Sequence, residues 1–389
     1  MFFFYLMKNI FIKMVRLRVI SYFLILLTYL YIIVFTYLHN RKNDGYVLGD
    51  WLINYQDGGF KRRGLSGSFF FLLQDVSGLS LNILVLSFQL IVISLFFYFF
   101  TKLLMQKQIT LLYLSLLLSP LGFIAYFNCV DYVGKKEFLL FAIFSYFAYQ
   151  VNSSMLTKRK EYIICVLLFI ATLFHEIVFF FVPYFIILLL INCKKINFKS
   201  YIKYILAVSI PIFLILLFGH EINEGNSLEI LKQRGVVITD GIFFWKINER
   251  DYIISQAKDY ILYAISFLIS FFHIKFYLKK EMLEKGLGWA FLFVFLYTLP
   301  LFILAIDWGR WFYIHMIMII VILGVLLKTR KDNNLVQKRF LITGNNIILL
   351  LFMLFSLTYR VEMSGKGFSF QGFFYRIFFV PLELIHKMI

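Results

Sequence analysis

Residues 162–193 read YIICVLLFIATLFHEIVFFFVPYFIILLLINC, an apolar run that His175 and Glu176 interrupt near its middle. A helix needs about 20 apolar residues to cross a bilayer, so this run is too long for a single span. We interpret it as two short helices that turn near His175 and return to the side from which they started. The turn fixes the orientation of every loop that follows it.

The composition of the whole chain points to a membrane protein. Of its 389 residues, 61% are hydrophobic, 21% are aromatic and only 15% are charged. A soluble domain of this length cannot bury so much apolar surface. We therefore predict an all-α, polytopic integral membrane protein that forms a single transmembrane domain over residues 1–389.

Nine further apolar runs are candidate spans, which brings the predicted total to about eleven transmembrane helices. Residues 1–12 are apolar but short, and we expect them to lie in the membrane interface. The nine runs are 19–38, 81–100, 109–127, 138–153, 204–218, 260–277, 287–306, 312–327 and 345–358.

The charges test this topology. With the N-terminus inside, 22 of the 39 Lys and Arg but only 4 of the 21 Asp and Glu fall on the cytoplasmic side. Cytoplasmic loops retain Lys and Arg, which explains the net charge of +18 without a nucleic-acid partner. A single span through 162–193 would put the basic cluster 328–339 outside, so the rule favours the turn. The larger extracytoplasmic segments are then about 39–80 and 219–259.

The first candidate site is the outer stretch Asp50–Gly67, which reads DWLINYQDGGFKRRGLSG. Arginine offers planar donors that suit phosphate, and the glycines that precede the basic triplet allow close backbone approach to an anion. We expect Lys61, Arg62 and Arg63 to bind a phosphate-bearing head group, and Asp57 to act as a base or to orient an arginine. The alternative is a basic anchor after an interfacial turn, but such anchors belong inside. Residues 69–73 are expected to form an interfacial or re-entrant helix.

Two further motifs have ionisable residues at apolar runs. His175 and Glu176 are costly inside a membrane unless they have partners, so either is a candidate base for an acceptor hydroxyl. The alternative is a turn exposed to outer water. In Asp307-Trp308-Gly309-Arg310-Trp311, Arg310 could face a phosphate while Asp307 orients it, or the two could form a purely structural pair.

The remaining polar segments give weaker signals. In the long outer loop most charges are expected to be solvated, and Arg234 and Arg250 are the best placed to touch a ligand. The short loop with Asp131, Lys135, Lys136 and Glu137 favours a structural role. No His-x-x-x-His spacing occurs, so we predict no required metal and no cofactor.

The three motifs GFKRRGLSG, FHE before a Pro-containing apolar helix, and DWGRW together resemble bacterial O-antigen and polysaccharide polymerases of the Wzy type, which are similar to the GT-C-like membrane glycosyltransferases. The resemblance implies a multi-pass bacterial inner-membrane enzyme whose active site faces the periplasm. Its substrate would be oligosaccharide repeat units on undecaprenyl diphosphate, and chain-length regulator and flippase proteins would be possible partners beside membrane lipid. It also implies that Arg62, Arg63 and Arg310 bind diphosphate, and that His175 or Glu176 is the base.

Other functions stay open. A flippase or other transporter should show paired repeats and charges at mid-membrane, and neither is visible. An acyltransferase would also use a buried histidine, but its donor arrives from the cytoplasm, where candidate catalytic residues are few. A glycosyltransferase of the same fold with a polyprenyl-phosphate sugar donor would need the same cations. In the polymerase interpretation, the three charged motifs should converge on one outward cavity.

Overall fold

The computed structural model describes residues 17–56, 59–192, 198–220, 222, 226–244, 249–255, 257–277, 286–305, 307–329, 344–362 and 368–379. Within these ranges the chain forms 17 α-helices, and its only strands are two short ones. The prediction of an all-α fold is therefore confirmed.

The elements follow in chain order, with two 3-10 turns and one π turn labelled η. They are α2 (Leu17–Arg41), α3 (Leu48–Trp51), α4 (Gly64–Ser77), α5 (Leu81–Met105), α6 (Leu111–Leu117), α7 (Ala125–Asn128), η1 (Val130–Tyr132), α8 (Glu137–Asn152), α9 (Lys158–Phe174), α10 (Ile177–Phe181), α11 (Pro183–Asn192), α12 (Phe198–Phe218), α13 (Ser227–Gln233), η2 (Ile242–Phe244), α14 (Glu249–Ser255), α15 (Asp259–Tyr277), α16 (Leu287–Leu304), α17 (Trp308–Leu326), α18 (Gly344–Ser356), β1 (Arg360–Val361), β2 (Phe368–Ser369) and η5 (Tyr375–Phe379).

Four helices in the described part of the chain are long and apolar enough to span a membrane, and they indicate a multi-pass membrane protein. The predicted total of about eleven such helices is wrong, because the other apolar helices have only 10–17 residues when counted over the residues whose side chains are described. The four are α2, α5, residues Tyr201–Phe218 of α12, and α17.

Local sequence explains the difference. The expected span 109–127 is broken, since α6 ends at Leu117 and α7 has only 4 residues. Pro120 lies in the gap between them and has no backbone N–H to continue a helix. Helices α8 and α9 have 16 and 17 residues, fewer than the ~20 that a full span needs.

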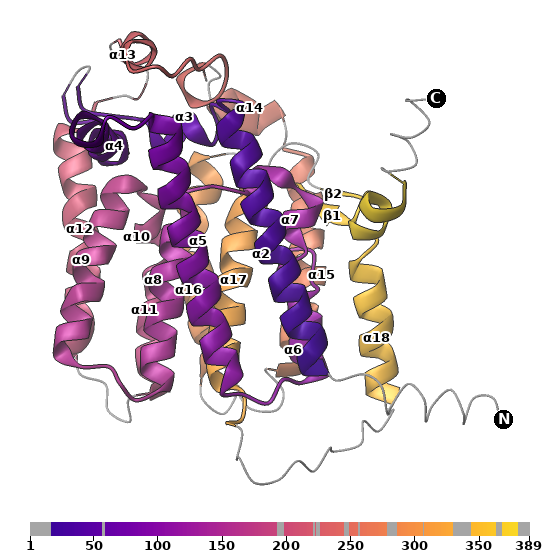
Figure 1. Ribbon diagram of the computed structural model, residues 1–389. Helices are drawn as coiled ribbons and strands as arrows, with labels where there is room; N and C mark the ends of the chain where they lie inside the picture. Colours follow the sequence, from indigo (N-terminus) through magenta and orange to yellow (C-terminus); the bar gives the residue numbers. More distant parts are fainter. Residues whose placement is uncertain are drawn as a thin grey trace.

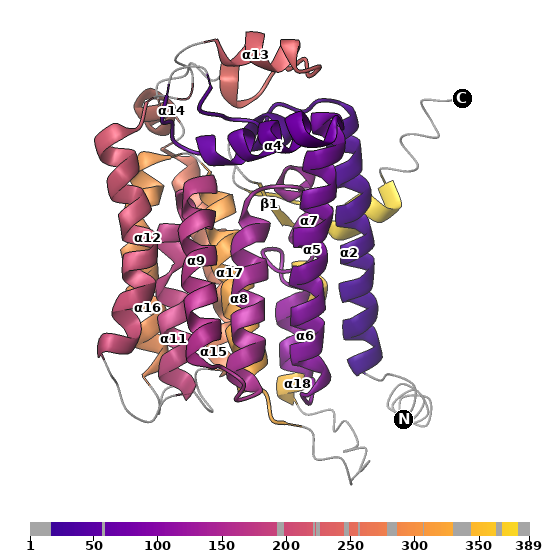
Figure 2. The ribbon, with the colours of Figure 1, turned by 60° about the vertical axis from the view of Figure 1, so that its left-hand side comes forward.

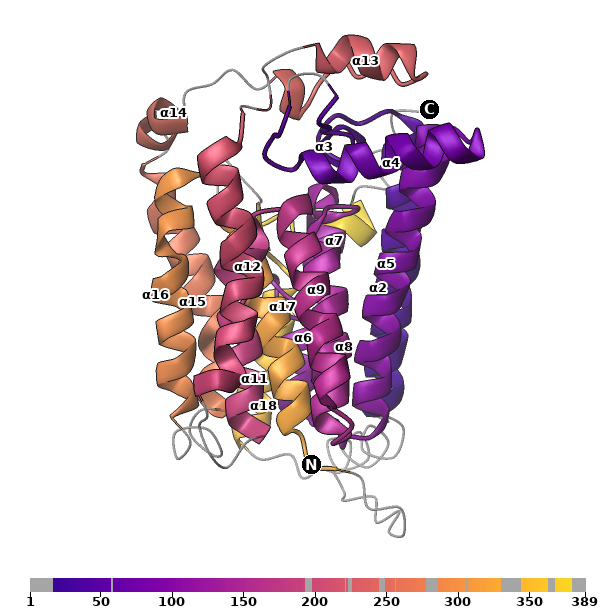
Figure 3. The ribbon, with the colours of Figure 1, turned by 90° about the vertical axis from the view of Figure 1, so that its left-hand side faces the viewer.

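The long helices run side by side between two ends of a bundle (Figures 1 and 3). Arg18, at the start of α2, donates to the carbonyl of Met105 at the end of α5, at 3.4 Å. The Asn82 amide, at the start of α5, donates to the carbonyl of Asn40 near the end of α2, at 2.9 Å. The two helices are therefore antiparallel. We call the end where α2 finishes the site end, and the other the opposite end.

Helix α17 lies at the centre of the bundle. Every residue from Trp308 to Gly324 is buried, and the helix contacts α5, α6, α8, α15 and α16. A helix that is apolar all round belongs in such a core. Its first turn therefore delivers Arg310 to the middle of the site end.

The predicted turn at His175 is confirmed. Helix α9 ends at Phe174, His175 has an extended backbone, and α10 begins at Ile177. Lys203, near the start of α12, forms an ion pair with Glu161, near the start of α9. The chain has thus returned to the end from which α9 started, and the turn itself reaches the site end.

Helix α4 lies across the site end instead of along the bundle (Figures 2 and 3). It contains the predicted interfacial segment 69–73. A Cβ at Gly64 would collide with the Tyr55 ring, and one at Gly67 would collide with the carbonyl of Ile53. These two glycines therefore let α4 pack on the preceding chain.

Candidate functional site

Arg63 links two of the three predicted motifs at the site end. From the turn before α4 it holds Glu176, in the turn between α9 and α10, through nitrogen–oxygen distances of 2.7 to 3.0 Å. Its Nη1 donates to Asp50 Oδ1 at 3.0 Å. Only 13% of the Arg63 side chain is exposed, so two carboxylates neutralise a mostly buried cation.

Arg310 brings the third motif into the same network. Its guanidinium donates to Asp307 at 3.1 Å, pairs with Glu137 at the start of α8, and lies 3.1 Å from Nε2 of His175. The side chain is 8% exposed. The motifs around residues 63, 176 and 310 therefore converge as the sequence predicts, whereas the outward cavity expected between them stays a prediction.

Lys136 adds a second cation at Asp50. Its Nζ lies 3.7 Å from Asp50 Oδ2 and 5.7 Å from the ring centre of Trp51, and its side chain is 0% exposed. Asp50 thus bridges Arg63 and Lys136. Beside them, the Trp51 indole donates to the carbonyl of Gly134 at 2.9 Å, which fixes α3 against the loop that precedes α8.

His175 is enclosed by charged groups. The Arg310 guanidinium, which can only donate, lies 3.1 Å from Nε2, and the backbone N–H of Ile177 donates to Nδ1 at 3.4 Å. That Nδ1 is 3.5 Å from a carboxylate oxygen of Glu176, while Nε2 is 3.6 Å from one of Glu137. With 1% of its side chain exposed, His175 positions its neighbours and does not meet solvent.

Two backbone features hold this arrangement. Arg63 has φ 65°, a left-handed conformation that is uncommon for a residue with a side chain. Its hydrogen bonds to Glu176 and Asp50 fix it there. A Cβ on Gly309 would collide with the carbonyl of Glu362, so only glycine lets the segment after β1 cross the first turn of α17.

Burial and charge shift the titration of this network. Burial raises the pKa of Asp50, but Lys136 and Arg63 outweigh it and hold that pKa well below its usual range. Burial lowers the pKa of Lys136 to about 8, although Asp50 opposes the shift. Asp50 is therefore ionised at neutral pH, and Lys136 is the cation that loses its proton most readily.

The basic triplet divides by exposure. Arg62 is the accessible member, with 45% of its side chain exposed and its Nε 3.7 Å from Glu176. Lys61 is buried at 1%, and its backbone pairs with that of His220. Arg62 is thus the member that can meet an external anion without leaving its place.

The outer-loop predictions have different outcomes. Arg234 donates to Asp75 at 2.8 Å and to Gln74 at 3.1 Å, and lies over the Phe71 ring, so it ties the segment after α13 to α4. It does not join the network around Arg310. Arg250 lies in α14, but its side chain is outside the described residues, as is Asp57.

Lys136 and Glu137 are network residues for which the sequence favoured a structural role and gave no partners. Four ionisable residues in one short loop did not indicate which of them would be buried. The available signal was position, because Glu137 opens an apolar run and such a run is buried from its first residue.

Two tyrosines pack beside the residues that precede Arg310 in α17. The hydroxyls of Tyr132 and Tyr263 are buried, and neither has a hydrogen-bond partner in the part of the chain that the structure describes. The Tyr132 hydroxyl lies beside Gly309, and the Tyr263 ring packs edge-on against Trp308. These hydroxyls are polar groups that a bound molecule or water could satisfy.

The described residues contain no group of three or more His, Cys, Asp or Glu side chains placed to hold a metal ion. The arrangement offers fixed cations, ionised carboxylates and one accessible arginine. No protein family, curated protein or solved structure matches the chain.

Proposed function

We propose that this chain is a metal-independent membrane glycosyltransferase that polymerises oligosaccharide repeat units carried on undecaprenyl diphosphate, as the polymerases of O-antigen and related surface polysaccharides do. The N-terminus would face the cytoplasm and the site end the periplasm of a bacterial inner membrane. The observation that carries the proposal is the network in which Arg63, Glu176, His175, Arg310 and Glu137 meet at one end of the bundle.

The donor's chemistry fits this end of a membrane protein. A lipid-linked donor places its tail in the bilayer, its diphosphate at the interface and its sugars in water. Negative charge grows on the diphosphate as the glycosidic bond to it breaks, and fixed cations stabilise that charge. Arg62 would contact the diphosphate because it is exposed, while Arg63 and Arg310, each paired with carboxylates, would hold the network beneath it in place.

Glu176 is our candidate base. Its side chain is 18% exposed and lies beside Arg62, whereas His175 is 1% exposed. In the proposed step, the acceptor hydroxyl oxygen bonds to the anomeric carbon, the bond to the diphosphate breaks, and the proton passes to Glu176. His175 would position Glu176 through Nδ1. The buried hydroxyls of Tyr132 and Tyr263 could hold sugar hydroxyls.

The test is glycan chain length in a strain from which the gene is deleted. We expect surface glycan to shrink to a single repeat unit, and the wild-type gene to restore long chains. Arg62→Ala and Glu176→Gln should fail to restore them, although both proteins reach the membrane in normal amounts. The matched control is Lys232→Ala, which removes an exposed cation from α13 without touching the network.

Arg310→Ala should fail as well, but it also strips Glu137 of its partner, so Arg62 gives the cleaner result. Full-length polymer with Arg62→Ala and Glu176→Gln would remove both residues from the mechanism. Repeat units trapped on the cytoplasmic side of the membrane would instead identify a flippase. A glycan that is full in length but lacks one sugar or acyl group would identify a modifying transferase.

A further inference from the structure

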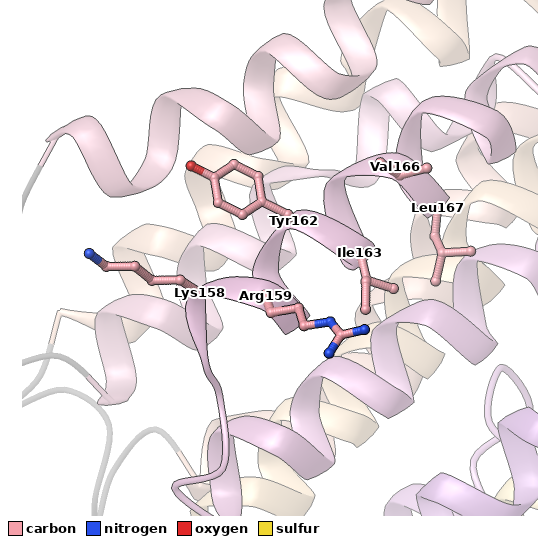
Figure 4. A pocket seen from close by; sticks show the side chains of 6 residues that line it. All are labelled: Lys158, Arg159, Tyr162, Ile163, Val166 and Leu167. Atoms are coloured by element: carbon pink, nitrogen blue, oxygen red, sulfur yellow. The ribbon is translucent and has the colours of Figure 1, made fainter.

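A groove runs along α9 at the opposite end of the bundle, and the proposed reaction does not use it. It has a volume of about 560 Å³ and is lined by Lys158, Arg159, Tyr162, Ile163, Val166 and Leu167 (Figure 4). A volume of this size suits a small-molecule ligand. Its lining changes in character along the helix, from two cations to apolar side chains.

The two cations at the mouth of the groove are uncommitted. Lys158 and Arg159 are exposed, and neither has an ion-pair partner among the residues that the structure describes. Their neighbours differ, because the Lys160 ammonium donates to Gln150 at 2.7 Å and Glu161 pairs with Lys203. The first turn of α9 therefore keeps two positive charges for something outside the protein.

The apolar part of the groove has the length of a lipid chain. From Arg159 to Leu167 is eight residues, or about 12 Å along a helix. One leaflet of a bilayer has a hydrocarbon thickness of roughly 15 Å. A lipid whose phosphate meets Arg159 would thus lay an acyl chain along Ile163, Val166 and Leu167 within its own leaflet.

We propose that this groove binds an anionic phospholipid of the leaflet at the opposite end, with its phosphodiester head group at Arg159, Lys158 as a second positive charge on the neighbouring side of the helix (Figure 4), and an acyl chain along α9. Charge complementarity selects the lipid class, because each Lys or Arg near an anionic head group raises the affinity for that lipid several-fold. The site is separate from the proposed transferase site, so it stands or falls independently of that function.

The experiment is native mass spectrometry of the full-length, detergent-purified protein titrated with phosphatidylglycerol or phosphatidylcholine. We expect the wild type to prefer phosphatidylglycerol by roughly 30-fold, which is the product of the affinity factors that the two cations contribute. Lys158→Gln/Arg159→Gln should reduce that preference to less than about 3-fold. The control is Lys102→Gln, which removes a charge from the last turn of α5, at the same end of the bundle. It should leave the wild-type preference intact.

Two more variants separate the parts of the site from a folding defect. Lys158→Arg/Arg159→Lys keeps both charges and should keep the preference. Leu167→Trp fills the groove and should weaken binding of both lipids while the cations remain. Equal binding of the two lipids by the wild type, or an undiminished preference in the double Gln variant, would overturn the proposal. So would full competition by soluble glycerol phosphate, because it has no acyl chain to occupy the groove.

Discussion

The two ends of the bundle use basic residues in opposite ways. At the site end, the side chains of Arg63, Arg310 and Lys136 are 13%, 8% and 0% exposed, and each has a carboxylate within ion-pair distance. At the opposite end, Lys158 and Arg159 are exposed and have no such partner in the described residues. A buried charge costs several kcal/mol unless it is paired, whereas an exposed one stays hydrated. Burial thus decides which cations are committed to the protein and which remain for a ligand.

Lys107 shows that burial, and not the end of the bundle, sets this rule. It lies at the opposite end, yet it is only 4% exposed. Its ammonium donates to the carbonyls of Val325 and Leu327, at 2.6 and 3.0 Å. These carbonyls end α17 and carry the negative end of its dipole, so they take the place of a carboxylate.

Removal of a buried cation should produce the largest loss of stability. Arg310→Met leaves Glu137 buried without its partner, and breaking such a pair typically costs about 3–5 kcal/mol. The measurement is the free energy of unfolding in mixed detergent micelles. The double variant Arg310→Met/Glu137→Met should lose less than Arg310→Met alone, because no unpaired charge remains. A loss below about 1 kcal/mol in the single variant would end the contrast between the two ends.

Lys136 should make the stability depend on pH. Burial lowers its pKa in the folded protein to about 8, while its unfolded value stays near ~10.4. Between these values the unfolded chain binds more protons, so stability from this group rises with pH across that window. The full rise in the free energy of unfolding across this window is about 3 kcal/mol. Between pH 7 and 10 the unfolding midpoint of the wild type should rise relative to that of Lys136→Met; parallel curves would contradict the shift.

The sequence was sufficient for the topology of the hairpin and for the convergence of the three motifs. His175 and Glu176 interrupt an apolar run, and that interruption is a local signal which periodicity and length can detect. The positive-inside rule then places residues 63, 176 and 310 at one end. The sequence could not identify the carboxylate partner of Arg310. That partner, Glu137, is distant in sequence and meets Arg310 only because α8 packs on α17.

The span count failed for a related reason. Hydropathy registers an apolar run but not the break inside it, so residues 109–127 read as one helix. In the structure the backbone turns between α6 and α7, and Gly122 packs where a Cβ would collide with the carbonyl of Leu116.

Substitution of two glycines in α17 tests how tightly the backbone is packed at each end of the bundle. Gly309→Ala places a Cβ against the main chain at Glu362, which cannot move like a side-chain tip, so we expect a loss of about 1–3 kcal/mol. Gly324→Ala, near the opposite end, meets the tips of the Tyr113 and Leu104 side chains and not the main chain, so small side-chain shifts can relieve the contact. The gain in helix propensity should offset part of that cost. The measurement is the unfolding free energy of each variant. A loss of stability in Gly324→Ala as large as that in Gly309→Ala would contradict the comparison.

The smallest effect on stability is expected where the cations are uncommitted. Lys158→Gln/Arg159→Gln breaks no ion pair in the described structure, and surface changes of this kind usually alter the unfolding free energy by less than about 0.5 kcal/mol. The measurement should be made in a detergent without anionic lipid, and then repeated with phosphatidylglycerol present. If the lipid binds at the α9 groove, it should raise the stability of the wild type but not of the double variant, because a ligand stabilises only the state that binds it. A large loss of unfolding free energy without lipid would mean that Lys158 and Arg159 stabilise the fold. The cations at both ends of the bundle would then be committed to the protein, and the comparison would fail.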